Sequence, residues 1–484
     1  MRVGERLVPW ALLALSGALR LAALDLRPLH HDEGSNAIFV MRLLEEGAYR
    51  YDPSNFHGPL LFYLTALAIG LLGDTTWAFR IAPALLGTAL APMAWGLKDA
   101  LGRPGAASAG LLLAVSPSMV YYARDNIHET YLVFFTLLLV VAVARGLRRD
   151  GARGPSPAGR AAWIAAAGGA AAGMVATKET SALILLALGA ALLLSGGAGL
   201  KRPDRRQVVW ALAAFVLVSS LLYSHFLADP AGLLGPFAAI GQWGRRAVAA
   251  SGHEKPWWYF AALLAREEWA VLAGALGAAG LAARPGRRFA RFLLLWGAGL
   301  LVVHSLIPYK TPWLGLNIIL PLALAGGGAF GRLLVASASR PRRAVAAAAL
   351  AIPVSLSAWR AASLCFARFD DPASPLVYVQ TSRDALRLVA AIEAAAARDP
   401  RGRSMPIDIV SPDYLPLNWY LRRFERVAYY GGRVPGPRAD VVIARADAAE
   451  AVAARLGPGF AREEYDLRPG VRLILFVRRG GPDL

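Results

Sequence analysis

Long apolar runs, separated by short polar links, dominate the chain. Eleven such runs can be distinguished, and most approach or exceed the roughly 20 residues that a helix needs to cross a bilayer. They occupy residues 7–24, 77–97, 104–122, 130–147, 161–176, 180–196, 207–228, 268–283, 289–307, 313–337 and 344–365. The first run lacks a small-x-small cleavage site before Asp25, so we predict a retained span and not a signal peptide. The pattern therefore predicts a mainly α-helical, polytopic membrane protein with about eleven transmembrane helices.

The apolar segment 59–73 is shorter than most of these runs. If it crossed the membrane, the basic links further along the chain would fall on opposite sides. If it lies in the interface or re-enters, all of them fall on one side. We adopt the interfacial interpretation. The first outer loop, residues 25–76, then carries interfacial helices, the N-terminus is cytoplasmic and the C-terminus is extracytoplasmic.

Six links between the apolar runs are strongly basic. Together they carry 20 Lys and Arg and four Asp and Glu, in segments 1–6, 98–103, 145–160, 201–206, 284–291 and 340–343. Short basic loops stay on the cytoplasmic side of a membrane, so the net charge of +19 is a topology signal. In a soluble protein the same charge would suggest nucleic-acid binding. Here it predicts a multi-pass protein of the cell membrane, with the lipid bilayer and no nucleic acid as partner.

Composition agrees with this picture. The mean hydropathy is +0.43, and only 18% of residues are charged, whereas a soluble domain averages about a quarter. These values exclude a disordered chain and disfavour a single soluble globule. The single cysteine, Cys365, excludes an internal disulfide framework and a cysteine-based metal cluster.

The pattern changes after about residue 366. Short strand-like runs alternate with helical ones, which is typical of a small α/β domain. The strand-like runs are 375–381, 405–411, 439–447 and 471–479, and the helical ones are 384–399 and 450–457. We therefore predict a membrane domain over residues 1–365 and an extracytoplasmic α/β domain over 366–484. This second domain has no glycine-rich phosphate loop and no clustered acids, so we assign it no chemistry; a lid or an interaction domain are the simple alternatives.

Histidine is sorted to the outer side. Five of the seven histidines lie in predicted outer connections, at positions 30, 31, 57, 128 and 253. A purely structural bundle gives no reason for this distribution. It indicates a functional site on the outer side of the membrane.

The first outer loop opens with His30, His31, Asp32 and Glu33. Apolar residues recur at helical spacing after it, so an amphipathic helix is predicted to begin near Asp32. Asp32 could then be only a helix N-cap. Alternatively, one of the two acids, at the membrane boundary, acts as a general base that takes a proton from an acceptor hydroxyl. We favour Asp32 as the base, with Glu33 as an orienting group or ligand, although the sequence does not rank them.

Other outer residues are candidates for binding. His57 is either a loop histidine bonded to backbone or a substrate or metal contact; a divalent metal ion is a candidate cofactor, which spacing alone does not establish. Basic outer residues that could hold a phosphate are Arg124, Lys178, Arg245, Arg246, Lys255 and Lys310. Arg124 with Asp125, and Lys178 with Glu179, could instead be simple ion pairs. Lys310, beside Trp313, has no adjacent acid.

Six short strings in order along residues 1–340 resemble a known family. They are HDE, HGP, ARDN, TKET, GHEKPWWY and PYKTPW. This set is similar to polyprenol-phosphate-sugar glycosyltransferases of the GT-C fold, in the protein-mannosyltransferase-like or ArnT-like superfamily. Together the strings are similar to one bacterial and archaeal subfamily, whose members are often labelled as associated with lipid-linked oligosaccharide flipping in N-glycosylation.

The resemblance implies transfer of a sugar, such as mannose or another hexose, from a polyprenyl-phosphate donor to an acceptor on the extracytoplasmic face, with inversion. The acceptor would be a glycan, a lipid or a protein. Asp32 or Glu33 would match the family's first-loop catalytic acid, Arg124 would line the donor pocket, and Lys178 and Lys310 would neutralise the leaving phosphate. The remaining substrate-binding candidates are His31, His57, Asp125, Glu179, Arg245 and Trp313.

Two other functions remain open. A flippase or transporter of lipid-linked oligosaccharide would place ionisable groups near the bilayer midplane, whereas most of them here lie at the ends of predicted spans. A non-catalytic accessory subunit of a glycosylation pathway would use the α/β domain for docking. The first loop lacks the D-x-D motif of nucleotide-sugar enzymes, which favours a lipid-phosphate donor.

Overall fold

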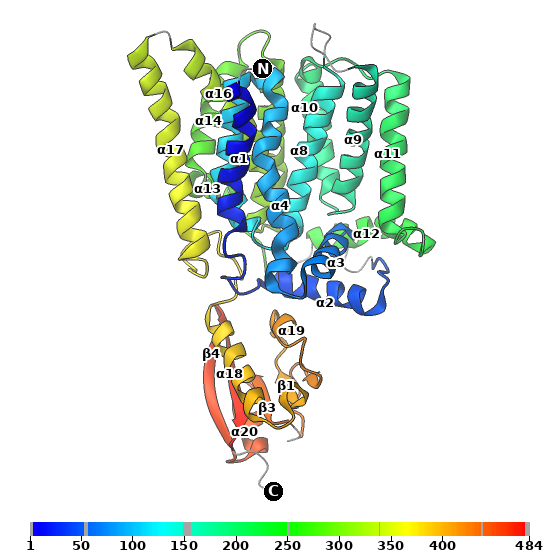
Figure 1. Cartoon of the computed structure of the whole chain (residues 1–484), viewed down its shortest axis with the longest axis vertical. Coiled ribbons are helices and arrows are strands. Elements are labelled where there is room, and N and C mark those ends of the chain that lie inside the picture. Colours follow the sequence, from blue (N-terminus) through cyan, green and yellow to red (C-terminus); the bar gives the residue numbers. More distant parts are fainter. Residues whose placement is uncertain are drawn as a thin grey trace. The chain divides into compact units, whose positions relative to one another are not determined.

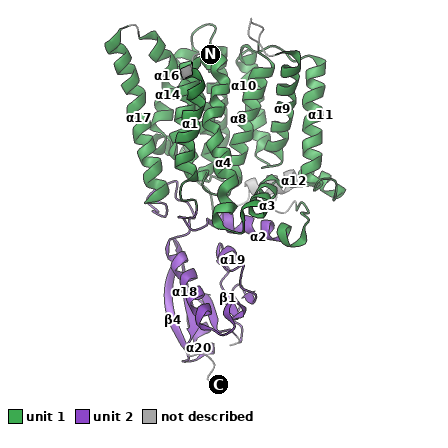
Figure 2. Cartoon of the chain, in the orientation of Figure 1, with its two compact units in different colours: residues 1–24, 43–368 green, residues 25–42, 369–484 purple. Residues whose placement is uncertain are grey.

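A computed structural model describes residues 3–52, 57–148, 156–248, 252–337, 339–436 and 439–479 of the 484-residue chain. The chain divides into two compact units (Figure 2). Unit 1 consists of residues 1–24 and 43–368, and unit 2 consists of residues 25–42 and 369–484. The first outer loop, which we assigned to the membrane domain as a whole, is thus shared between the two units.

Unit 1 is a bundle of apolar helices (Figure 1). Its helices are α1 (Val3–Leu21), α3 (Leu60–Leu72), α4 (Thr76–Ala94), η1 (Trp95–Leu97), α5 (Lys98–Leu101), α6 (Arg103–Val115), α7 (Pro117–Tyr122), α8 (His128–Gly146), α9 (Pro157–Val175), α10 (Ser181–Leu194), η2 (Gly197–Gly199), α11 (Arg205–Tyr223), η3 (Pro230–Leu234), α12 (Gly235–Val248), α13 (Tyr259–Glu267), α14 (Trp269–Ala282), α15 (Arg288–Leu306), η4 (Pro312–Gly315), α16 (Leu316–Ala336) and α17 (Arg340–Phe366). Helix α2 (His31–Glu46) begins in unit 2 and ends in unit 1.

The prediction of a polytopic, mainly α-helical membrane protein is confirmed, because each predicted apolar run overlaps a helix of the bundle. By length and composition, six helical stretches within the described residues could cross a membrane: α4 with its extension to Leu101, α8, α11, α15, η4 with α16, and α17. The count of eleven spans stays a prediction. Helix α3 has 13 residues, about 20 Å of helix against a hydrocarbon core of about 30 Å. It lies near one end of the bundle (Figure 1).

Ion pairs join three of the basic links at one end of the bundle. Glu5 lies 2.5 Å from Arg103, and Asp99 lies 2.7 Å from Arg148. The links around residues 1–6, 98–103 and 145–148 therefore meet on one side, as expected for loops that share a membrane face.

Small residues allow the closest helix contacts. Gly327 and Gly331 of α16 face Gly105 and Ala109 of α6, so both helices present small residues four positions apart. A Cβ added at Gly327 would lie 2.3 Å from the backbone nitrogen of Ala109, and one at Gly331 would lie 2.2 Å from that of Gly105. Close backbone approach of this kind stabilises helix pairs in lipid through van der Waals packing.

Unit 2 contains a five-stranded mixed sheet with the strand order β2-β1-β3-β5-β4. Its strands are β1 (Ile407–Val410), β2 (Val427–Tyr429), β3 (Val441–Arg445), β4 (Phe460–Arg468) and β5 (Val471–Arg478), and its helices are α18 (Asp384–Arg398), η5 (Gly402–Ser404), α19 (Leu417–Tyr420) and α20 (Ala449–Leu456). The β1–β2 and β1–β3 pairs are parallel, whereas β5 pairs antiparallel with β3 and β4.

Both faces of this sheet are covered. Val441 and Ile443 of β3 belong to the apolar core that includes α18, whereas Val442 and Ala444 belong to the core that includes α20. This alternation follows from the two-residue period of a strand. The predicted small α/β domain is confirmed.

One predicted strand is absent from the described structure. Residues 375–381 form no ladder. Within this segment the Tyr378 carbonyl bonds to the His30 ring, and the Gln380 side chain donates to the Pro28 carbonyl. Polar groups of this segment therefore bond to the first outer loop and not to a neighbouring strand.

Gly327→Val is expected to lower the thermal unfolding midpoint of the detergent-solubilised protein, because its side chain collides with the α6 backbone. Overpacking of this kind costs about 1–3 kcal/mol or more. Gly299→Val is the matched control, since a Cβ at Gly299 meets nothing within 4 Å. Equal midpoints for the two variants would contradict the proposed close packing of α6 against α16.

Candidate active site

The two adjacent acids of the first outer loop, Asp32 and Glu33, have different environments. Glu33 is fully buried, and its Oε2 accepts a hydrogen bond from the backbone N–H of His30 at 2.8 Å. The carboxylate therefore satisfies a donor just before α2, where a helix leaves backbone N–H groups without internal partners. Glu33 helps to build the start of the helix.

Asp32 is half-buried, and its carboxylate has no hydrogen-bond or ion-pair partner within the described part of the chain. Its backbone N–H donates to Nδ1 of His30 at 3.0 Å, so the turn that carries the carboxylate is held by its neighbours. Of the two acids, Asp32 is the one that remains available to a substrate.

His31 precedes these acids at the first position of α2. Burial lowers the pKa of this imidazole, and the negative charges of Asp32 and Asp413 offset part of that effect. Its Nδ1 is buried and has no hydrogen-bond partner among the described residues. The cation that acts electrostatically on both His31 and Asp32 is Arg468, which forms its ion pair with Asp413.

Unit 1 holds a group of charged and polar side chains, which we call the outer cluster: the buried His128, Glu129 and Lys178 and the partly exposed His57 and Glu179. Nδ1 of His57 lies 2.9 Å from Oε2 of Glu179, and the rings of His57 and His128 are 4.3 Å apart at their centroids. Lys178 forms an ion pair with Glu129. The cluster joins the segment before α3, the first turn of α8 and the turn between α9 and α10.

Electrostatics keep the two charged residues of the α9–α10 turn ionised. Burial alone would lower the pKa of Lys178, but Glu129 and Glu179 raise it above its ordinary value. Burial alone would raise the pKa of Glu179, but His57 and then Lys178 lower it. The predicted Lys178–Glu179 pair is thus part of a larger set, in which Glu129 is the direct partner of Lys178.

Lys310 has a different environment. Its Nζ donates to the backbone carbonyl oxygens of Ile307 at 2.5 Å and Lys255 at 3.2 Å, and it has no carboxylate partner within the described residues. The nearby Trp313 is buried and packs edge-on against Tyr122, with ring centroids 6.0 Å apart. Burial lowers the pKa of Lys310. Its positive charge is therefore held by dipoles and is not neutralised by an acid.

Arg124 forms structural contacts at the end of α1. Its guanidinium donates to four backbone carbonyls, those of Leu19, Arg20, Ala22 and Ala23, at 2.6–3.2 Å. It thereby satisfies carbonyl groups that a helix C-terminus leaves without partners. The neighbouring Asp125 is buried and lies 3.8 Å from Arg80. The geometry of both residues fits a structural role; the place of Arg124 in a donor pocket and substrate binding by Asp125 stay predictions.

The structure thus brings some candidates together and separates others by unit. His57, Lys178 and Glu179 meet in the outer cluster, and Lys178 also interacts electrostatically with Tyr309, next to Lys310. His31, Asp32 and Glu33 belong to unit 2, whereas Lys310 and Trp313 belong to unit 1. Arg245 lies in α12, and its side chain is outside the described part of the chain.

Metal ligands were also predicted as an option. In the described ranges, no three His, Cys, Asp or Glu side chains are grouped so that they could hold a metal ion. The pairs that do occur, such as His57 with Glu179, are accounted for by hydrogen bonding. A divalent metal at this site stays a prediction.

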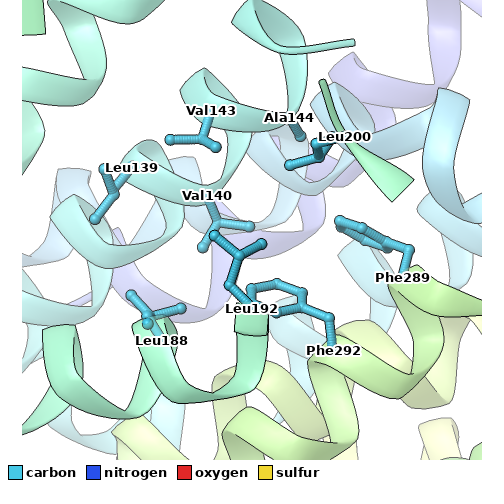
Figure 3. Close-up of a pocket in the computed structure, with 10 residues that line it drawn as sticks. Leu139, Val140, Val143, Ala144, Leu188, Leu192, Leu200, Phe289 and Phe292 are labelled. Carbon is cyan, nitrogen blue, oxygen red and sulfur yellow. The ribbon is translucent and has the colours of Figure 1, made fainter. Parts of the chain in front are cut away.

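An apolar pocket lies between helices of unit 1 (Figure 3). It is lined by Leu139, Val140, Val143, Ala144, Leu188, Gly189, Leu192, Leu200, Phe289 and Phe292. None of the candidate site residues lines it. Its walls suit hydrocarbon and offer no side-chain donor for a sugar or a phosphate.

Solved structures resemble the whole chain. ArnT from Cupriavidus metallidurans bound to undecaprenyl phosphate matches with a TM-score of 0.68 at 18% sequence identity, over 96% of this chain and 97% of that chain. The chain has the GT-C fold. The Archaeoglobus fulgidus oligosaccharyltransferase, tethered with an acceptor peptide, matches with a TM-score of 0.61 at 13% identity, over 93% of this chain and 70% of that chain.

Sequence comparison agrees with the fold. Residues 56–223 match the family model of dolichyl-phosphate-mannose-protein mannosyltransferases. No curated protein matches the chain. The predicted resemblance to the GT-C superfamily is confirmed, and the family match together with the fold supports the predicted enzyme class, a glycosyltransferase, in a multi-pass membrane protein.

Sequence reasoning missed two features of the site. It did not assign Glu129 as the partner of Lys178, because the two residues are far apart in sequence. It also gave no role to the Tyr/Trp-rich stretch near residues 414–420, whose side chains contact the first outer loop. The unusual aromatic content of that stretch was the available signal.

Lys178→Met is expected to lower the thermal unfolding midpoint strongly, because it leaves the buried Glu129 carboxylate without its cation. Removing one partner of a buried pair costs about 3–5 kcal/mol. Adding Glu129→Gln should restore much of the lost stability in detergent-solubilised protein. A double variant as unstable as Lys178→Met would contradict a direct pairing of these two residues.

Proposed function

We propose that the protein is a membrane glycosyltransferase that moves a sugar from a polyprenyl-phosphate donor to an acceptor hydroxyl or amide on the extracytoplasmic face. The GT-C fold and the match of residues 56–223 to a mannosyltransferase family support this class. The observation that carries the residue assignment is the contrast between the available Asp32 carboxylate and the buried, hydrogen-bonded Glu33.

In the proposed reaction Asp32 is the general base. The acceptor oxygen or nitrogen attacks the anomeric carbon of the donor while the bond from that carbon to the phosphate oxygen breaks. The acceptor proton passes to the Asp32 carboxylate, and polyprenyl phosphate leaves with the bonding electron pair. A single displacement of this kind inverts the anomeric configuration. Phosphate is a good leaving group, so the reaction requires no strong general acid.

Cations would stabilise the departing phosphate. Lys310 supports this role best, since its charge is held by backbone carbonyls and is not neutralised by a carboxylate in the described residues. Lys178 is already paired with Glu129, so we assign it mainly to shaping the site together with His57 and Glu179. Trp313 and His31 are each proposed to contact the substrate.

Two solved structures of similar fold support a lipid-phosphate partner. They are ArnT bound to undecaprenyl phosphate and the archaeal oligosaccharyltransferase AglB in complex with a dolichol phosphate and an inhibitory peptide. For this chain we propose a polyprenyl-phosphate sugar as donor and a glycan, lipid or protein as acceptor. We also propose a cytoplasmic N-terminus, since the basic links meet at one end of unit 1.

Asp32→Asn is expected to reduce sugar transfer by about 10²–10⁴-fold, the usual contribution of a general base. The assay uses purified protein in detergent, a radiolabelled polyprenyl-phosphate hexose and an acceptor extract. Glu33→Gln is the matched control. Its amide oxygen can still accept from the His30 N–H, so transfer should stay within about tenfold of the native rate.

Two outcomes would contradict the assignment of the base: native transfer by Asp32→Asn, or a loss of transfer with Glu33→Gln as large as that with Asp32→Asn. Translocation of the labelled lipid across vesicles without any transfer would instead favour the flippase alternative. A Lys310→Met variant with unchanged kcat would remove Lys310 from the proposed phosphate site.

A further inference from the structure

The C-terminal domain makes direct hydrogen bonds to the turn that carries Asp32. The Tyr420 hydroxyl accepts from the Leu29 N–H at 2.8 Å, and Nδ2 of Asn418 donates to the Gly34 carbonyl at 2.8 Å. We call this contact the seam. It is completed by hydrogen bonds between Gln380 Nε2 and the Pro28 carbonyl, at 3.1 Å, and between His30 Nε2 and the Tyr378 carbonyl, at 2.7 Å.

The contacts of the seam lie on both sides of Asp32 along the sequence. The four contacts fall at residues 28, 29, 30 and 34, on both sides of the carboxylate. Three of the four are made to backbone groups of the loop and the fourth is made by the His30 side chain, so together they fix the path of the chain. Because the backbone is held on both sides of Asp32, the position of its Cα atom, and hence of its carboxylate, is restricted.

Gly34 brings the two segments into van der Waals contact. A Cβ added there would lie 2.7 Å from Cα of Pro416 and 3.2 Å from Oδ1 of Asn418. Because the first of these atoms is backbone, no side-chain rotation relieves the contact. Glycine is therefore the residue that lets α2 lie directly on the 414–420 segment.

The sheet holds the other side of the seam. Asp413 accepts from Arg468 at 2.6 Å and from Arg445 at 3.0 Å, and these arginines end strands β4 and β3. Arg468 is nearly buried and also donates to the Leu415 carbonyl at 3.1 Å. Two strand ends therefore fix the loop that leads into Pro416, Asn418 and Tyr420.

Electrostatic interactions also link Asp32 to the strand-end residue Arg468, and to Asp413 through His31. The negative charge of Asp32 acts on the Arg468 guanidinium, and Arg468, Asp413, His30 and Asp32 all act on His31. These interactions place the strand end and the first turn of α2 in one electrostatic neighbourhood. They agree with the hydrogen bonds, which join the same two segments.

We propose that the C-terminal α/β domain is a positioning element of the transfer site, which fixes the Asp32 carboxylate through the seam that Tyr378, Gln380, Asn418 and Tyr420 form with residues 28–34. This inference rests on the proposed function, because it takes Asp32 as the base. It gives a role to a domain that the sequence left without chemistry. Asn418 and Tyr420 are positioning residues: they touch the loop and act on catalysis through Asp32.

The test measures transfer by the full-length protein with Tyr420→Phe and Asn418→Ala, combined, in the native and Asp32→Asn backgrounds. In the native background kcat should fall about tenfold or more, since small misplacement of a reacting group is costly. The KM for the polyprenyl-phosphate sugar should change less than twofold. In the Asp32→Asn background the same pair should cause no further loss. Gly34→Ala should lower kcat in the same way.

Tyr430→Phe is the matched control, because Tyr430 lies in the same domain and its hydroxyl has no hydrogen-bond partner among the described residues. It should leave kcat, KM and the thermal midpoint unchanged. Midpoints for all variants, measured by differential scanning fluorimetry in detergent, identify any that fail to fold. If the combined variant fails to fold, Tyr420→Phe alone serves as the milder variant.

The outcomes separate the two hypotheses. If Asp32→Asn abolishes transfer but the folded seam variants keep native kcat, the positioning role is wrong and the base assignment stands. If the seam variants reduce transfer by the same factor in both backgrounds, they act independently of Asp32, and the positioning role is again wrong. If Asp32→Asn transfers sugar at the native rate, the base assignment itself fails, and this inference fails with it.

Discussion

A charged group can leave water at low cost only where an opposite charge or several dipoles receive it, and this constraint explains where the buried charges of the chain lie. In unit 1 the guanidinium of Arg124 donates hydrogen bonds to four carbonyl oxygens at the end of α1. Lys178 forms an ion pair with Glu129, and Lys310 donates to two carbonyl oxygens. These contacts fix helix ends and turns near the polar residues of an otherwise apolar bundle.

The same constraint separates residues that build the site from residues that remain available to react. Glu33 is buried because it satisfies the N–H of His30, and so it belongs to the helix start. Asp32, its neighbour, is half-buried, and its carboxylate makes no hydrogen bond or ion pair within the described residues, although its charge acts on Arg468 and His31. Two adjacent carboxylates thus receive different roles from their surroundings. The proposed base is the one whose charge the protein does not use for its own structure.

Much of the fold could be predicted from the sequence. Run lengths and basic links gave a polytopic helical protein, and the change of pattern after residue 366 gave the α/β domain, because both signals are local and periodic. The segment 375–381 was predicted wrongly as a strand. Its apolar and β-branched residues suit a ladder, but its polar groups bond to the first outer loop instead.

The site was less accessible to sequence reasoning, since its decisive contacts join distant residues. Adjacent charges suggested Lys178 with Glu179 and Arg124 with Asp125, whereas the structure pairs Lys178 with Glu129 and Asp125 with Arg80. Sequence adjacency does not say which way two side chains point. The contact of Asn418 with Gly34 spans 384 positions, and no local pattern encodes it.

The most direct test of the account is a structure of the protein with a non-transferable polyprenyl-phosphate sugar bound. We expect the anomeric carbon of the bound donor to face the Asp32 carboxylate across a gap that fits one acceptor group. A donor whose anomeric carbon lies closer to another carboxylate, with Asp32 directed away from the sugar, would contradict it.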